Sequence, residues 1–157
     1  MDIRKAIEKD VDALYQLLTD VQQLHADGRS DIFIGGTTKY TKEQISKIIA
    51  NDNTPVFVAV DQSDLAIGYA FCLIEQTGGT FNLNAIKNFY IDDLCVQKEY
   101  RGKGIGKAIY NYLLTVAKEY GCYHLTLNVW HLNENALKFY QKLGMKPLKT
   151  TMEQIIE

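Results

Sequence analysis

The most constraining feature of this sequence is an apolar strand, a glycine-rich corner and an amphipathic helix in direct succession. The stretch D-D-L-C-V-Q-K-E-Y-R-G-K-G-I-G-K occupies residues 92–107 and continues the apolar run that begins at Phe89. Gly102, Gly104 and Gly106 form the corner. The apolar residues that follow have the three- and four-residue spacing of one buried helical face. They are Ile105, Ile109, Tyr112, Leu113, Val116, Ala117 and Tyr120.

Such a corner favours the binding of an anion. The first N–H groups of a helix have no partner inside the helix, and the helix dipole adds positive potential there. Glycine lets the backbone approach a bulky phosphate, because no Cβ intervenes. Arg101, Lys103 and Lys107 place full positive charges around the same loop. We interpret the stretch as a cradle for a pyrophosphate.

Two common phosphate-binding loops do not fit these residues. A P-loop requires G-x-x-x-x-G-K-[ST], but Arg101 stands at its first glycine and Ala108 at its Ser/Thr. The dinucleotide fingerprint G-x-G-x-x-G fails because Lys107 stands at its third glycine. The pattern that remains is Arg-Gly-x-Gly-x-Gly.

A second motif follows the next apolar segment. The sequence N-E-N-A-L-K-F-Y-Q-K-L-G-M resembles N-x-x-A-x-x-(F/L)-Y-x-x-x-G-F, the second signature of the GNAT superfamily of acetyl-CoA-dependent N-acetyltransferases. The matching residues are Asn133, Ala136, Phe139, Tyr140 and Gly144, and Met145 replaces the usual Phe. The first signature, Q/R-x-x-G-x-G/A, is matched by Arg101, Gly104 and Gly106. The resemblance is good over residues 55–147 and covers the N-terminal third in outline.

Composition is typical of one globular domain over residues 1–157. The net charge of −2 gives no indication of nucleic-acid binding. We expect no membrane span, because no apolar run approaches the roughly 20 residues that one needs. The N-terminus lacks the layout of a signal peptide, and we expect a cytoplasmic protein.

Cys72, Cys95 and Cys122 have no metal-ligand spacing and the histidines are dispersed, so we expect buried thiols and no metal site.

Periodicity predicts a mixed α/β fold, in which about four helices flank a mostly antiparallel sheet, as in the GNAT fold. Thr41 is the expected N-cap of the second helix, and Gly144 is the expected C′ residue of the last. The expected strands are 1–6, 56–60, 66–75, 89–96 and 124–130, with two further short strands at 146–148 and 151–156. The expected helices are 8–24, 42–50, the glycine-initiated segment that ends near Tyr120, and 133–143.

The resemblance implies a donor site for acetyl-CoA. Main-chain groups of Leu94, Cys95 and Val96 are expected to pair with the pantetheine arm, and one N–H there is expected to serve as the oxyanion donor. The other expected cofactor-binding residues are Arg101, Gly102, Lys103, Gly104, Ile105, Gly106, Lys107, Asn133, Ala136 and Tyr140.

Acetyl transfer to an amine needs a base and an acid. An alkyl ammonium has a pKa near 10.4, so its deprotonation at pH 7 costs roughly 4.6 kcal/mol. The departing thiolate needs a proton donor, and the resemblance assigns this role to Tyr140. Asn133 lies seven residues earlier on the same helical face. The alternative is that Tyr140 belongs only to the core stripe of its helix.

The base is expected on the central strand. The segment F-Y-I-D-D-L-C-V-Q-K-E-Y-R-G-K-G-I-G resembles the polyamine acetyltransferases, in which an acidic residue, usually Glu, relays the amine proton through water. Asp92 aligns with that residue. Strand alternation places Asp93 on the opposite face, and Asp93, His25 and Glu75 are the alternatives. Cys95 as an acyl-carrying nucleophile is a further alternative that lacks a partner histidine.

The segment 24–34, an expected irregular loop, is implied to line the acceptor side. Its candidate substrate contacts are His25, Asp27, Arg29, Asp31 and Phe33, and Asp92 completes the acceptor set. The alternative is a surface loop that Phe33 pins to the body. Trp130 and His131 are candidates to flank the acetyl group. The carboxylates favour a cationic small-molecule amine.

Three functions are compatible with these residues. The first is an acetyl-CoA-dependent N-acetyltransferase that acts on a small amine in a ternary complex. The second is a peptide or protein acetyltransferase, which would need an open groove. The third is a non-catalytic acyl-CoA sensor, against which the joint presence of Asn133 and Tyr140 argues. The resemblance also leaves open a homodimer formed through residues 151–156.

Overall fold

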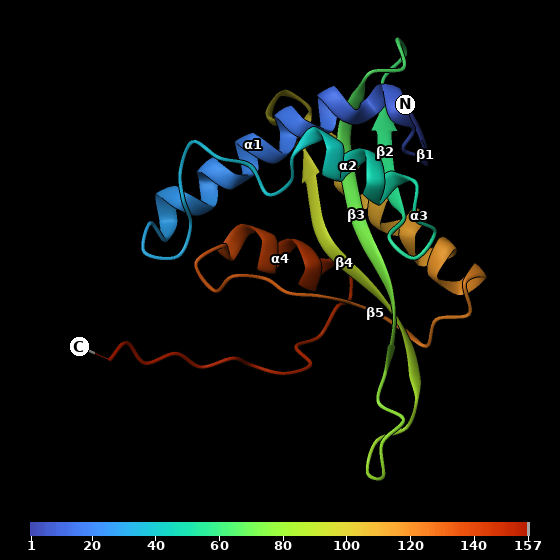
Figure 1. The fold of residues 1–157 in the computed structure, drawn as a ribbon, viewed down its shortest axis with the longest axis vertical. Helices are drawn as coiled ribbons and strands as arrows, with labels where there is room; N and C mark the ends of the chain where they lie inside the picture. The colour runs from blue at the N-terminus through green and yellow to red at the C-terminus, as the bar shows by residue number, and fades with distance from the viewer. Residues whose placement is uncertain (157) are drawn as a thin grey trace.

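The computed structural model describes residues 1–156 as a mixed α/β fold (Figure 1). Its order is β1 (Asp2–Lys5), η1 (Glu8–Asp10), α1 (Val11–Gly28), α2 (Lys42–Ile49), β2 (Val56–Val60), β3 (Ala66–Thr77), β4 (Ile86–Val96), η2 (Lys98–Tyr100), α3 (Ile105–Glu119), β5 (His124–Leu127) and α4 (Glu134–Lys142). The predicted fold class is confirmed.

One five-stranded sheet follows the chain, in the order β1-β2-β3-β4-β5. The first four strands are antiparallel to their neighbours, and β5 runs parallel to β4. A parallel pair needs a crossover connection, and α3 supplies it. The expected strands 56–60 and 66–75 form an antiparallel hairpin, β2 and β3, in a mostly antiparallel sheet.

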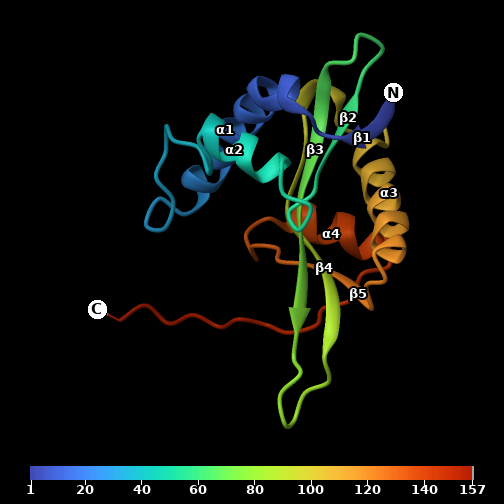
Figure 2. The same cartoon turned by 45° about the vertical axis from the view of Figure 1, so that its right-hand side comes forward.

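Helices cover both faces of the sheet. Figure 2 shows α1 and α2 on one side and α3 on the other. The first core joins α1 and α2 to alternate strand residues such as Val58, Tyr69 and Phe71. The second core joins α3 to the residues between them, such as Ala70 and Cys72. Strand alternation therefore sorts the apolar side chains into two cores.

The predicted helix ends agree with the structure at two places. Thr41 caps α2 with a reciprocal capping box: its Oγ1 accepts from the Gln44 N–H at 3.2 Å, and Gln44 Oε1 accepts from the Thr41 N–H at 2.8 Å. Gly144 follows α4 with a φ of +92°. The first helix is shifted from its predicted range of 8–24: residues 8–10 form a 3₁₀ turn, α1 begins at Val11, and the helix continues to Gly28, into the expected irregular segment.

The prediction of two final strands is wrong for the part of the chain that the structure describes. Residues 146–156 form no helix or strand, and they run away from the body (Figures 1 and 2). Pro147 has no N–H to donate to a ladder. A few apolar residues are not enough to form a strand when no sheet edge pairs with them. The side chains of Arg29 and Glu153 form an ion pair at 2.9 Å that ties this segment to the end of α1.

Candidate active site

The predicted anion cradle lies at the start of α3. Gly104 is the N-cap residue with a φ of +81°, a conformation that favours glycine. The described structure gives this end of the helix no side-chain cap and no acidic residue in the first turn. A Cβ added to Gly102 or Gly104 would meet no atom within 4 Å. The corner is therefore open around these two glycines, and the first N–H groups of α3 have no partner inside the helix, as an anion site requires.

Three cations surround this corner, as the sequence predicts. The side chains of Arg101, Lys103 and Lys107 are exposed. Arg101 is held in place, because its Nε donates a hydrogen bond to the Val96 carbonyl at 2.8 Å. The ammonium of Lys103 lies 5.1 Å from the ring centroid of Tyr100. The corner thus combines backbone donors with three exposed positive charges.

Gly106 has a different reason to be glycine. It lies inside α3, and a Cβ there would come within 3.2 Å of Phe139 Cζ on α4. Its role in this structure is close packing between the two helices that carry the two motifs. Gly102 and Gly104 thus leave the corner open, whereas Gly106 allows the two helices to come into contact.

Strands β4 and β5 separate beside the cradle. Their pairing ends at Ile91 and Leu127 in the described residues, although β4 continues to Val96. The predicted strand 124–130 is therefore too long at its C-terminal end. Leu94, Cys95 and Val96 lie on the part of β4 past this last pair. This edge is open to an added extended ligand, but the Val96 carbonyl already accepts from Arg101.

A β-bulge at Asp92 corrects the prediction that the two aspartates lie on opposite faces. Phe71 pairs with Asp93 and Cys72 pairs with Ile91, so Asp92 is the extra residue on β4. The bulge shifts the alternation: Ile91 belongs to the second core, whereas Cys95 belongs to the first. Both aspartates therefore point to the face that α1 and α2 cover.

Asp93 is a partly buried carboxylate next to the strand opening. Its Oδ2 accepts a hydrogen bond from the Tyr69 hydroxyl at 3.1 Å. Burial raises the pKa of Asp93 to about 6, although the positive charge of Lys39 and the Tyr69 hydrogen bond oppose that rise. A carboxylate that titrates near neutrality is suited to accept a proton at pH 7.

Asp92 is occupied by two neighbours that sequence reasoning missed. Its Oδ2 lies 2.7 Å from the Lys39 ammonium and 3.0 Å from the Tyr40 hydroxyl. Both neighbours precede α2, and Tyr40 also packs on Phe71 with ring centroids 5.7 Å apart. Neither lies on a periodic face or in a recognisable motif, so no sequence signal marked them.

Tyr140 lies on α4 and is partly buried against the second core. Its ring lies 6.4 Å from that of Tyr110. Burial, with the negative charge of Asp93, raises the pKa of Tyr140, so the phenol stays protonated at neutral pH. Its hydroxyl makes no hydrogen bond with any residue from 1 to 156. The helix begins after Asn133, whose Oδ1 caps it by accepting from the Ala136 N–H at 3.1 Å.

The residues predicted for the acceptor side fall into two groups in the structure. His25 stacks on Phe33 with ring centroids 4.9 Å apart, and Phe33 meets Trp130 edge-on at 5.1 Å. Burial, and then the charge of Lys39, lower the pKa of His25, so this aromatic cluster includes a neutral imidazole at pH 7. The structure therefore links the end of α1 to the segment between β5 and α4.

The exposed carboxylates of the acceptor prediction have other partners. Arg29 binds Asp31 through two hydrogen bonds of 2.8 and 2.7 Å, and this guanidinium lowers the pKa of Asp31. Asp27 accepts from Gln23 Nε2 at 2.7 Å. Among residues 1–156, no hydrogen bond joins Asp27 or Asp31 to the pair of aspartates on β4.

The sequence offered Cys95 as a nucleophile and Glu75 as a base, each as an alternative. Burial raises the pKa of Cys95 to about 11, so its thiol is protonated and a poor nucleophile at neutral pH. Glu75 accepts a hydrogen bond from the buried Asn88 at 3.1 Å. All three cysteines are free thiols.

In residues 1–156, no cluster of three or more His, Cys, Asp or Glu side chains is arranged to hold a metal ion.

None of the helices in the described chain is long and apolar enough to cross a membrane.

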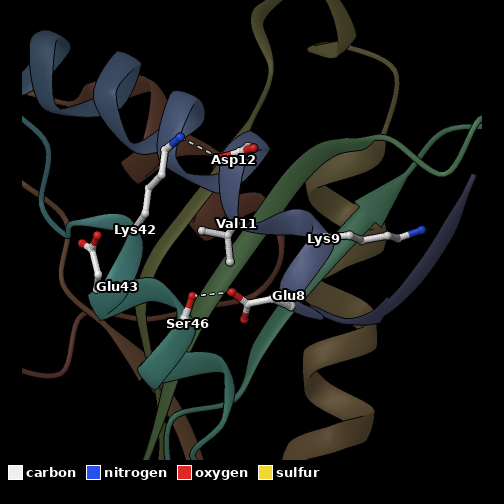
Figure 3. Close-up of a pocket in the computed structure, with 7 residues that line it drawn as sticks. All are labelled: Glu8, Lys9, Val11, Asp12, Lys42, Glu43 and Ser46. Carbon is white, nitrogen blue, oxygen red and sulfur yellow. Dashed lines mark hydrogen bonds and ion pairs between the residues drawn. The ribbon is translucent and has the colours of Figure 1, made fainter.

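A surface depression of about 400 Å³ lies elsewhere, between η1, the start of α1, and α2 (Figure 3). Polar contacts cross it: Ser46 donates to Glu8 at 2.7 Å, and Lys42 pairs with Asp12 at 2.6 Å. None of the predicted site residues is among the described residues that line it. A smaller cavity of about 60 Å³ lies beside Asp92 and is lined in part by Tyr40, Phe71 and Cys72.

Comparison with known proteins agrees with this geometry. The family model described as "Acetyltransferase (GNAT) family" matches residues 12–145. The chain therefore belongs to the GNAT acetyltransferase family, and it is an acetyl-transferring enzyme. Thialysine N-epsilon-acetyltransferase from Bos taurus is 28% identical over 137 residues, which are 87% of this chain and 73% of the relative.

Two solved structures show the same fold. A crystal structure of a mutant of the BH1408 protein from Bacillus halodurans superposes with a TM-score of 0.96, at 30% identity and full coverage of both chains. The aminoglycoside N-acetyltransferase AAC(6')-Iy in complex with CoA has a TM-score of 0.71 at 17% identity, with 99% of each chain covered. At that identity the second likeness concerns the fold alone.

Proposed function

We propose that this enzyme transfers the acetyl group of acetyl-CoA to a primary amine of a small molecule, by direct attack in a ternary complex. The observation that carries the proposal is the opening between β4 and β5. Asp92 and Asp93 follow directly after the last β4–β5 pair, and the predicted anion cradle follows the end of β4. A donor in the cradle and an amine at the carboxylates would meet there.

The residues of the corner fit acetyl-CoA. The first turn of α3, with Arg101, Lys103 and Lys107, would hold the pyrophosphate, and the open edge of β4 at Leu94 and Cys95 would bind the pantetheine amides. Bound acetyl-CoA supplies a thioester carbonyl. A β4 N–H at this edge would stabilise negative charge on the carbonyl oxygen. Nδ2 of Asn133 would add a donor, because only its Oδ1 serves the helix cap.

We assign the proton transfers to Asp93 and Tyr140, and the binding of the substrate ammonium to Asp92. The pKa of about 6 suits Asp93 as the base, directly or through one water molecule. Tyr140, protonated at neutral pH, would donate to the departing thiolate. The water relay through Asp92, which the resemblance implies, is the alternative.

The first test is thiol release from acetyl-CoA with a panel of amines. The panel contains putrescine, spermidine, a lysine analogue, an aminoglycoside and a peptide with a free N-terminus. We expect turnover with at least one small amine and little with the peptide. Turnover with the peptide alone would overturn the small-molecule assignment. No turnover with any amine, together with tight binding of acetyl-CoA, would instead indicate an acyl-CoA sensor.

A second test addresses Tyr140. Replacement of Tyr140 by Phe removes the proton donor and keeps the ring, so kcat should fall by about 100-fold while the KM for acetyl-CoA stays unchanged. Tyr110→Phe is the matched control on α3, because it removes a hydroxyl from the neighbouring ring. An unchanged kcat in Tyr140→Phe would reject the assignment.

We also propose that the chain forms a homodimer through its C-terminal segment. Leu148, Met152 and Ile155 are exposed, and the outer edge of β5 pairs with no strand of the described chain. An exposed strand edge and an extended apolar segment are complementary. Sedimentation velocity tests the proposal, and a monomer at micromolar concentration would refute it.

A further inference from the structure

Lys39 places the chain's own ammonium group on the acceptor side of the proposed site. Its Nζ lies 2.7 Å from Asp92 Oδ2, and 5.5 Å from the ring centroid of Tyr40. The Asp92 side chain is 19% exposed and that of Lys39 is 39% exposed, so solvent reaches the pair only in part. The contact resembles the one that a substrate ammonium would make with the same carboxylate.

The other titratable groups around Lys39 define the charge of this region. Asp93 is largely ionised at pH 7, and His25 is neutral there because burial and the charge of Lys39 lower its pKa. Tyr40 is a neutral phenol, since burial raises its pKa. Two carboxylates and one ammonium therefore leave about one net negative charge on the acceptor side.

We propose that Lys39 is a specificity-determining residue, whose ammonium occupies the acceptor position on Asp92 and makes the site select singly charged amines over diamines. The inference rests on the proposed function, and it names a substrate class for the same site. An incoming ammonium must displace Lys39 from Asp92. The displaced Lys39 remains beside the substrate, because its backbone is fixed next to Tyr40 and the N-cap of α2.

This arrangement distinguishes two amines of equal length. A monoamine neutralises the one net negative charge of the site. A diamine adds a second positive charge near the displaced Lys39, and like charges in a partly desolvated site repel each other. Removal of the Lys39 charge would leave two carboxylates for two ammonium groups, so the preference should turn toward the diamine.

The test compares putrescine with 4-amino-1-butanol, in which a hydroxyl replaces one ammonium. In Lys39→Met, the ratio of kcat/KM for putrescine to that for 4-amino-1-butanol should rise by about tenfold over the wild type. Lys39→Arg retains the charge and should leave the ratio within about twofold. Lys42→Met removes a nearby lysine that pairs with Asp12, away from the site, and should also leave it unchanged.

Two results would overturn the inference. One is an unchanged ratio in an active Lys39→Met enzyme. The other comes from binding without turnover: putrescine should raise the melting temperature of Lys39→Met more than that of the wild type, and an equal rise would contradict the role of Lys39. If the wild type acetylates neither amine, the proposed small-amine activity fails for this pair, and the melting experiment still decides the role of Lys39.

Discussion

The two helices that carry the two sequence motifs are anchored very differently. Helix α3 buries six residues, namely Ile105, Ile109, Tyr110, Leu113, Val116 and Ala117. Helix α4 buries none of its residues, all of which the structure describes, and β5 beside it is only partly buried. Two motifs that look equally strong in the sequence thus differ in how firmly the fold holds them.

This difference separates the donor side from the rest of the proposed site. The cradle is made of backbone at the end of a buried strand and the start of a buried helix, so its geometry follows from the core. The position of Tyr140 depends on α4, which meets α3 through the contact of Phe139 with Gly106. A helix held by few contacts responds to small changes at those contacts.

The largest expected effect is the loss of a core side chain from α3. Leu113 is fully buried, so Leu113→Ala should lower the free energy of unfolding by about 2 to 5 kcal/mol. Leu143 follows α4 and is half-buried, and Leu143→Ala is the matched change, with an expected loss below about 1.5 kcal/mol. Urea denaturation measures both, and equal losses would contradict the unequal anchoring.

The next effect in size is a pH dependence that originates at Asp93. In the folded chain the pKa of the Asp93 carboxyl is about 6, whereas the pKa of an aspartate in the unfolded chain is near 3.9. The unfolded state therefore binds fewer protons in that window, and stability falls as the pH rises from about 4 to 6. Asp93→Asn should remove this loss, which is about 2 kcal/mol.

The substitution that raises stability, Asp93→Asn, should lower activity. Asp93→Asn is expected to be more stable than the wild type at pH 8. The kcat/KM of the wild type should rise with pH near 6, and this rise should be absent from the variant. Asp92→Asn is the control, because it removes the negative charge that pairs with Lys39 and should not gain stability. An unchanged pH–rate profile in Asp93→Asn would return the base assignment to Asp92.

A smaller effect is expected where the two helices meet. Gly106→Ala places a methyl group 3.2 Å from Phe139 Cζ, but alanine is also favoured over glycine inside a helix by about 1 kcal/mol. The two terms nearly cancel, so the free energy of unfolding should change by less than about 1 kcal/mol. The kcat should fall several-fold, because Phe139 and Tyr140 move together. A variant with lower stability and full activity would show that this contact does not position Tyr140.

The smallest effect is expected at the C-terminus. A chain that ends at Thr150 loses Met152 and Ile155, both exposed, and the Glu153 partner of Arg29. Within one copy, its melting temperature should therefore hardly change. If sedimentation shows a dimer for the full chain and a monomer for the truncated one, the segment is the interface. A large loss of melting temperature at a concentration where both chains are monomeric would contradict this account.

Several features could be predicted because they depend on neighbours in the chain. Thr41 and Gln44 are three residues apart, and the capping box needs nothing else. Gly104 can adopt the positive φ that the start of α3 needs, because glycine has no Cβ. The apolar periodicity of α3 indicates the face that the second core buries. Each of these follows from local sterics, hydrogen bonding and helical repeat.

The composition of the proposed site depends on distant residues, and the sequence did not reveal it. Alternation places Asp92 and Asp93 on opposite faces, and only the register of β4 against β3 shows the bulge that brings them together. Lys39 is 53 residues from Asp92, and no periodic pattern connects them. The segment 151–156 is short and partly apolar, but a strand also requires an edge to pair with.

The sequence by itself determined the family, the order of strands and helices as far as α4, and the glycine-rich, cationic corner at the start of α3. Short-range residue spacing and the conformational freedom of glycine specify these features. Only the tertiary structure decided which side chains share the acceptor side. The bulge, the burial of Asp93 and the pairing of Lys39 with Asp92 arise when β3, β4 and the segment before α2 pack against one another. Burial and charge proximity are properties of the packed chain, and they set the pKa of Asp93 and the charge of the acceptor side.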